Sequence, residues 1–243
     1  MFKPVQKQSL TQQVFNQIRD SILNNTYRPG QRLPSERELC DALHINRSSL
    51  REALKRLEQA RLIEIRHGEG SVVLDFKTTA GFDLLRDMVM PNGELNLLAL
   101  RSIAEVRTLV TTHMARLCAQ RADKAYIDEI SSIAEQIEQL GDNSNKQFQN
   151  LDFAFHYAMA QASQNLALVL ILNSIRDIYF EFQDFFEPMF SMARQEPAIY
   201  LKIAEAIRKK DANKAAKLTE KLVETGNRLF LDLARQMQET APQ

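Results

Sequence analysis

The first residues with a spacing suited to chemistry are two cations near position 50. Arg47 and Arg51 stand four residues apart, with Ser48 and Ser49 between them. On a helix this spacing places both guanidinium groups on one face. Arginine offers a two-pronged donor to guanine O6 and N7, and serine bonds phosphates or base edges. The pattern predicts a helix face that reads DNA. The alternative is a pair of cations that merely solvates an amphipathic helix.

A carboxylate and an imidazole form the second pair. Asp152 and His156 are also four apart, so they share a helix face. Such a pair serves as acid and base in an enzyme, as two metal ligands, or as a structural contact. The other histidines, His44, His67 and His113, all precede it, and two ligands rarely make a tight metal site. There is no GxSxG turn and no phosphate-binding loop. We therefore expect no metal, no cofactor and no enzyme activity.

The elements that must position the arginines are three helices and a hairpin. Helical periodicity predicts a first helix at 9–24. Ser35 and Glu38 form a capping-box pattern ahead of a short second helix, and Asn46 is a plausible N-cap for a third helix that ends near Ala60. Two β-like runs follow at 62–66 and 71–76. This order predicts a winged helix-turn-helix over residues 1–78.

Three further residues complete the expected DNA-binding surface. Arg37, at the start of the second helix, is placed for a backbone phosphate. His67 and Gly68 fall at the tip of the wing, where a glycine lets the main chain approach the minor groove.

Beyond Gly81 glycine becomes rare and the pattern turns helical. Residues 79–97 are expected to form a linker with a short helix at 81–90. An all-α helical bundle follows at 98–243. The fold class is therefore mostly α, a winged helix-turn-helix joined to a helical bundle. Its helices are expected near 97–121, 123–140, 144–163, 165–187, 195–209 and 211–238.

Composition and charge agree with this division. The chain is 44% hydrophobic and 26% charged with a net charge of zero, yet residues 1–78 carry +4 and residues 79–243 carry −4. Only the first part is therefore expected to meet a polyanion. No apolar run approaches the ~20 residues of a membrane span, and the start lacks a signal-like apolar segment, so we expect a cytoplasmic protein with no membrane partner. Cys40 and Cys118 have no CxxC spacing, which excludes disulfide frameworks and zinc ribbons.

The stretch LPSERELCDALHINRSSLREALKRLEQARLIEIRHGEGSVV resembles the GntR family of bacterial regulators. It contains a similar LPSERELA opening, a similar SR-x-x-(L/V)REAL motif of the recognition helix, and an RxGxGxxV wing. The resemblance implies a DNA-binding transcription regulator. Because one recognition helix reads too few bases for useful specificity, we expect a homodimer on a palindromic operator of double-stranded DNA. It also implies a set of DNA-contacting residues, to which the helix pattern adds Ser48: Arg37, Arg47, Ser49, Arg51, His67 and Gly68.

The second part resembles the helical effector domain of the FadR subfamily. The matching pieces include Glu105-Val106-Arg107, the run LDFAFH at 151–156 and Ser163-Gln164-Asn165. In many members an Asp, a His or Asn four residues later and two later histidines hold a divalent metal that ligates a carboxylate effector. Asp152 and His156 match the first pair. Tyr200 or Leu201, and Leu222, stand at the two later places.

The incomplete ligand set is similar to the fatty-acid-responsive branch of the subfamily, which shares the His-Gly wing and takes long-chain acyl-CoA. Eight of the 13 phenylalanines lie between residues 148 and 190, an arrangement that could line an acyl channel or form a bundle core or a dimer interface. Three alternatives remain open: a small organic or sugar acid as effector, a helical enzyme, and a protein-interaction module. The residues expected to bind the effector are Arg107, Asp152, His156, Tyr179, Phe186, Leu222, Gly226 and Phe230.

Overall fold

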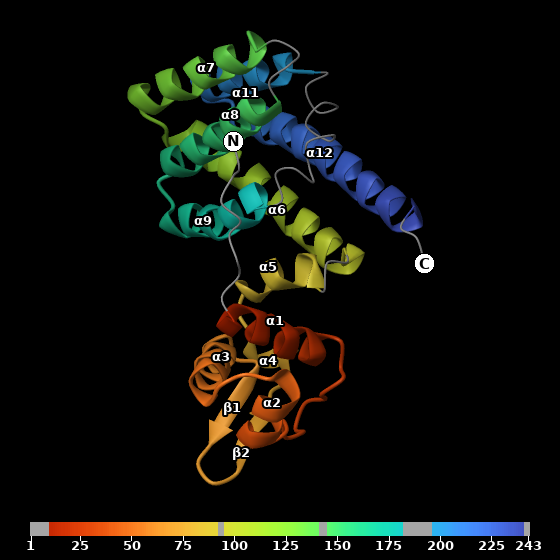
Figure 1. The fold of residues 1–243 in the computed structure, drawn as a ribbon. Coiled ribbons are helices and arrows are strands. Elements are labelled where there is room, and N and C mark those ends of the chain that lie inside the picture. Colours follow the sequence, from red (N-terminus) through yellow and green to blue (C-terminus); the bar gives the residue numbers. More distant parts are fainter. Residues whose placement is uncertain (1–9, 92–94, 141–144, 182–195, 241–243) are drawn as a thin grey trace, which may run out of the picture. The chain divides into compact units, whose positions relative to one another are not determined.

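The computed structural model describes residues 10–91, 95–140, 145–181 and 196–240 (Figure 1). The chain divides into two compact units, Met1–Glu94 and Leu95–Gln243. The predicted boundaries at residues 78 and 97 remain predictions. Each unit has its own hydrophobic core and is described by itself.

The first unit is a three-helix cluster with a two-stranded hairpin, as the sequence predicts. Helices α1 (Leu10–Leu23) and α3 (Arg47–Gln59) pack against each other, and α2 (Glu36–Leu43) packs on α3. Strands β1 (Ile63–Arg66) and β2 (Gly70–Val73) pair antiparallel, with Ile63 opposite Val73. The core side chains come from all of these elements and include Phe15, Ile18, Ile22, Leu50, Leu54, Leu57, Leu62 and Ile63.

Local capping explains where α2 and α3 begin. The Ser35 hydroxyl accepts from the Glu38 amide, and the Glu38 carboxylate accepts from the Ser35 amide at 2.8 Å, so the predicted capping box is present. The Asn46 side chain accepts from the Ser49 amide at 2.8 Å and caps α3. These side chains satisfy backbone amides at the helix starts that have no partner within the helix.

The second strand ends earlier than the sequence pattern predicts. The expected run 71–76 stops at Val73, because the Asp75 carboxylate accepts from the Lys77 amide at 3.1 Å and starts helix α4 (Phe76–Thr79). The free edge of β2 is covered by the loop before α2, where the Leu33 amide donates to the Ser71 carbonyl. A further short helix, α5 (Leu84–Val89), lies inside the predicted 81–90 segment.

The second unit is an all-helical bundle. Its longest helices, α6 (Leu97–Arg121) and α12 (Ala212–Thr240), pack along each other. The others are α7 (Lys124–Glu138), α8 (Asn145–Ala162), α9 (Leu166–Glu181) and α11 (Ala198–Arg208). The predicted helices coincide with these to within a few residues, and positions 182–187 of the fourth lie outside the described residues. Among the described helices, none combines the length and apolar character needed to cross a lipid bilayer.

Candidate functional site

The first candidate surface is the exposed side of α3. Arg47, Ser48 and Arg51 are exposed, and with Glu52 and Lys55 they line one open surface. The opposite side of the helix carries Leu50, Ala53, Leu54 and Leu57, which are buried in the core of the unit. The apolar side anchors the helix, so the cationic side is presented on a rigid support.

The two arginines of this surface differ in how they are held. The Nε of Arg51 donates to both carboxylate oxygens of Glu36, at 2.9 and 3.1 Å. Arg47 makes no hydrogen bond or ion pair with the part of the chain that the structure describes. Arg37 is exposed next to Glu36 at the start of α2. The three cations therefore lie on two adjoining helices, α2 and α3. One of these cations, Arg51, is already oriented by the Glu36 carboxylate.

The turn between β1 and β2 forms an exposed wing. Gly68 and Gly70 have φ angles of +75° and +88°, a backbone region that favours glycine, and His67 beside them is exposed. Arg66 pairs with Glu64 at 2.7 Å, and Arg32 reaches Glu69 at 3.2 Å. His67 and Gly68 thus occupy the tip, with the neighbouring basic side chains tied to carboxylates.

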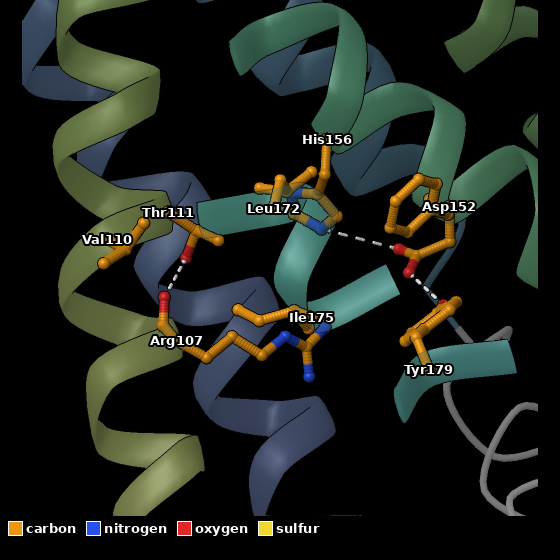
Figure 2. Close-up of a pocket in the computed structure, with 9 residues that line it drawn as sticks. Arg107, Val110, Thr111, Asp152, His156, Leu172, Ile175 and Tyr179 are labelled. Atoms are coloured by element: carbon orange, nitrogen blue, oxygen red, sulfur yellow. Dashed lines mark hydrogen bonds and ion pairs between the residues drawn. The ribbon is translucent and has the colours of Figure 1, made fainter. Parts of the chain in front are cut away.

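The second candidate site is a pocket in the helical unit (Figure 2). Three helices form it, α6, α8 and α9, and the close-up shows their side chains converging on one space. Its volume is about 30 Å³, enough for one or two water molecules. The pocket is lined by Arg107, Val110, Thr111, Asp152, Phe153, His156, Leu172, Ile175 and Tyr179.

Asp152 is the polar centre of this pocket. Its Oδ2 accepts from the Tyr179 hydroxyl at 2.5 Å, and its Oδ1 accepts from the Tyr200 hydroxyl at 2.6 Å. Both carboxylate oxygens are therefore occupied by phenolic donors. Burial, followed by the charge of Asp152, raises the pKa of each tyrosine well above its ordinary value, so both hydroxyls keep their protons.

His156 lies beside Asp152 with its ring unsatisfied. Its Nε2 is 3.6 Å from Asp152 Oδ1, and neither ring nitrogen has a hydrogen-bond partner among the described residues. Burial lowers the pKa of His156; the nearby Asp152 carboxylate raises it and Arg107 lowers it again. The ring is therefore neutral near pH 7 and has one donor and one acceptor to offer.

Arg107 supplies the positive charge at the pocket. Its Nη1 donates to the Asn227 side chain at 3.1 Å. Asn227 is buried on α12 and donates in turn to the Ala104 carbonyl and the Thr108 hydroxyl, each at 2.9 Å. Gly226 stands next to it, where an added Cβ would be 4.0 Å from the same Nη1. The arginine is thus braced by α12 while it faces the pocket.

Four of the expected effector residues line this pocket together: Arg107, Asp152, His156 and Tyr179. Leu222, Gly226 and Phe230 lie on α12 outside its lining, and Leu222 and Phe230 pack against the core. Phe186 lies outside the described residues. Sequence reasoning left out the apolar lining residues and Asn227. Part of that lining can be found from helical spacing, because Val110 and Thr111 lie three and four residues after Arg107. The hydrogen bond from Arg107 to Asn227 depends instead on the packing of α12 on α6.

The donor set does not fit the divalent metal of the wider subfamily. Tyr200, at one of the two later ligand places, donates a hydrogen bond to Asp152 instead of completing a ligand set. Leu222, at the other, offers no donor atom. The described residues contain no group of three or more His, Cys, Asp or Glu side chains that could hold a metal ion.

Comparison with known proteins places both units in described families. Residues 10–73 match the profile of the bacterial regulatory proteins of the gntR family, and residues 102–225 match the FCD domain. The chain belongs to the GntR family. Its winged helix-turn-helix is the DNA-binding module, and its FCD domain is the effector-binding module.

Relatives that align with both units agree with this assignment. The HTH-type transcriptional regulator Mce2R of Mycobacterium tuberculosis is 33% identical over 225 residues, covering 93% of each chain. The fatty acid metabolism regulator protein of an Enterobacter species is 33% identical over 163 residues, covering 67% of this chain and 66% of the relative. This GntR-family protein is a transcription regulator and not an enzyme.

A solved structure shares the fold. A GntR-family regulator from Pseudomonas syringae aligns with a TM-score of 0.52 and 17% identity over 95% of this chain and 88% of its own. At that identity the likeness supports the architecture alone.

Proposed function

We propose that this regulator binds a palindromic operator as a homodimer, and that a long-chain acyl-CoA or fatty acid bound in the FCD pocket releases it from DNA. The operator is read by α3, with Arg47, Ser48, Ser49 and Arg51 at base edges and phosphates. Arg37 contacts a phosphate of the DNA backbone, and His67 and Gly68 reach the minor groove. One recognition helix contacts few base pairs, so two copies on a two-fold site give the required specificity.

The observation that carries the effector proposal is the capping of Asp152 by two tyrosines. Because Tyr179 and Tyr200 each donate to one of its oxygens, the carboxylate has fewer free lone pairs to offer a metal ion or a ligand donor. The polar groups left for a ligand are the Arg107 cation and the neutral His156 ring. A negatively charged or strongly polar head group fits these two side chains.

The rest of the lining suits an apolar chain. Val110, Phe153, Leu172 and Ile175 form the walls, and Phe153 also contacts the ring of Phe180, with centroids 5.2 Å apart. An acid with an apolar chain matches this division into a polar end and an apolar wall. The name of the Enterobacter relative, a fatty acid metabolism regulator, supports the same class of ligand.

The small volume of the pocket supplies the link to DNA binding. A space of about 30 Å³ does not hold an acyl chain, so binding requires the packed helices to separate. A ligand shifts a conformational equilibrium only by its differential affinity for the two states. Each buried methylene contributes about 0.8 kcal/mol, so a long chain supplies more than the few kcal/mol that such a shift needs.

The test is a titration of the full-length protein on a fluorescent operator duplex obtained by selection from random DNA. Acyl-CoAs of increasing chain length are expected to release the duplex, with affinity that rises with length until the pocket is full. Arg107→Gln should weaken release, whereas Arg101→Gln, an exposed arginine on the same helix, should leave it unchanged.

A second candidate is a short organic or sugar acid held by Arg107, whose binding needs less separation of the helices than that of an acyl chain. If no acyl-CoA releases DNA while a short hydroxy- or keto-acid does, the acyl-CoA proposal fails and this second function replaces it. Dependence of that release on Arg107 would still assign the pocket as the effector site.

A further inference from the structure

Among the described residues, Glu36 and Arg51 form the one ion pair that joins α2 to α3. Both carboxylate oxygens accept from Nε, at 2.9 and 3.1 Å, and no described residue accepts a hydrogen bond from Nη1 or Nη2. The contact therefore holds the guanidinium at its inner nitrogen and leaves its two outer nitrogens available.

Those outer nitrogens are part of the donor set with which arginine reads guanine. The guanidinium is rigid and planar, so hydrogen bonds from Nε to Glu36 also fix the direction of the two outer nitrogens. An arginine side chain otherwise samples many rotamers, and ordering it on DNA costs entropy. A carboxylate that restricts Arg51 before DNA arrives reduces that cost and penalises bases that need another orientation.

Glu36 is itself well placed to act as a fixed support. It is the first residue of α2, whose start is set by the capping box of Ser35 and Glu38. A negative charge at a helix N-terminus is favoured by the helix dipole. Its side chain is 41% exposed and that of Arg51 is 63% exposed, so the pair lies at the molecular surface.

The pair also has a cost for binding. A carboxylate next to the DNA surface repels phosphates and offsets the charge of Arg51, so it lowers affinity for every sequence. Arg47 carries no such partner among the described residues. We propose that Glu36 is a positioning residue for Arg51, which trades general DNA affinity for discrimination at one operator base pair. This role rests on the proposed function, in which α3 reads the operator.

The experiment compares Glu36→Gln with the wild-type full-length protein on three kinds of DNA. These are the selected operator, a set of operators with single base-pair changes, and calf-thymus DNA as the non-specific probe. We expect Glu36→Gln to bind calf-thymus DNA more tightly. Discrimination at the base pair that Arg51 contacts should fall about fivefold or more, within the range of a lost oriented arginine–guanine contact.

Two matched variants make the outcome decisive. Asp41→Asn removes another exposed acid from α2, and should raise non-specific binding without changing base discrimination. In an Arg51→Ala background, Glu36→Gln should have no further effect on discrimination, because the side chain that it orients is gone. Thermal melting of each variant checks that the unit is folded.

The contrary results are separable. If Glu36→Gln changes operator and non-specific binding by the same factor, as Asp41→Asn does, Glu36 has only a charge effect and the positioning role is overturned. If Arg51→Ala itself leaves base discrimination unchanged, Arg51 reads no base and the positioning role is overturned. If Arg47→Ala also leaves it unchanged, α3 is not the reading helix, and the proposed DNA contacts fail as well.

Discussion

The Tyr200 hydroxyl donates to Oδ1 of Asp152 at 2.6 Å, across 48 residues of sequence. Tyr200 is buried on α11 and Asp152 is buried on α8. A buried carboxylate is costly unless it is hydrogen-bonded, so this contact stabilises the helical unit and occupies the oxygen that faces His156.

Replacing Tyr200 by Phe should therefore destabilise the helical unit. The change leaves one oxygen of Asp152 without its donor, which costs about 1–3 kcal/mol in a buried setting. Chemical denaturation monitored by circular dichroism measures the loss. Tyr157→Phe is the matched control, since the Tyr157 hydroxyl makes no hydrogen bond to the described residues. Equal stability losses in the two variants would contradict the assigned role of the Tyr200 hydroxyl.

The buried His156 ring predicts a dependence of stability on pH. Burial lowers its pKa below the ordinary value of about 6.5, so on acidification the unfolded chain takes up a proton that the folded chain does not. The stability tied to the neutral ring is complete above about pH 6.5 and falls as the pH drops, with a slope of up to about 1.4 kcal/mol per pH unit.

Denaturation curves near pH 7.5 and pH 5.5 check this slope. The wild type should lose more stability between the two conditions than His156→Gln, which has no proton to take up at that position. His113→Gln, an exposed histidine on α6, should behave like the wild type. A wild-type loss no greater than that of His156→Gln would show that the ring does not titrate in this range.

The elements of the DNA-binding unit were predictable because their signals are local. Ser35 and Asn46 cap helices within three residues of themselves, and the side chains of α3 follow its periodicity. The end of β2 was predicted wrongly for an equally local reason. The apolar run continues past Val73 to Leu74, but Asp75 caps α4 and the strand ends before it.

The effector pocket was predictable only in part. Spacing of four brought Asp152 and His156 together, and the family resemblance singled out Arg107 and Tyr179. The contacts that give the pocket its chemistry join residues far apart in sequence. Tyr200 meets Asp152, and Asn227 meets Arg107 at a separation of 120 residues. Such contacts follow from how α11 and α12 pack in the bundle, which periodicity does not specify.

A further prediction concerns metal content. Because two tyrosine hydroxyls occupy Asp152, dialysed protein should contain no equimolar zinc, nickel or manganese by elemental analysis. A carboxylate and an imidazole alone, here Asp152 and His156, rarely hold such ions tightly. An equimolar metal that is lost in Asp152→Ala would refute this prediction and restore a metal-held carboxylate effector.

A buried ion pair joins α5 to α1 within the first unit. Arg19 contacts Asp87 at 2.7 Å and Asp20 at 2.8 Å, and its own side chain is only 8% exposed. Asp87→Asn should lower the free energy of unfolding by about 1–3 kcal/mol, less than for a fully buried pair because Asp20 still faces Arg19. Asp83→Asn, an exposed position just before α5, is the control. Calorimetry of the full chain reports the change, and equal effects would remove any special role for the pair.

The last prediction separates base reading from phosphate binding on the DNA surface. Arg47→Ala should cost about 1–3 kcal/mol on the selected operator and relax the preference at one base pair, because a base contact is lost. Arg37→Ala should weaken all sequences alike and reduce the slope of log affinity against log salt by about 1, because a phosphate contact is lost. Lys202→Ala, an exposed cation of the helical unit, should change neither quantity. Fluorescence anisotropy over a range of salt concentrations measures both. If Arg47→Ala lowered affinity uniformly and Arg37→Ala changed base preference, the two roles would have to be exchanged, and the docking of α2 and α3 on the operator reassigned.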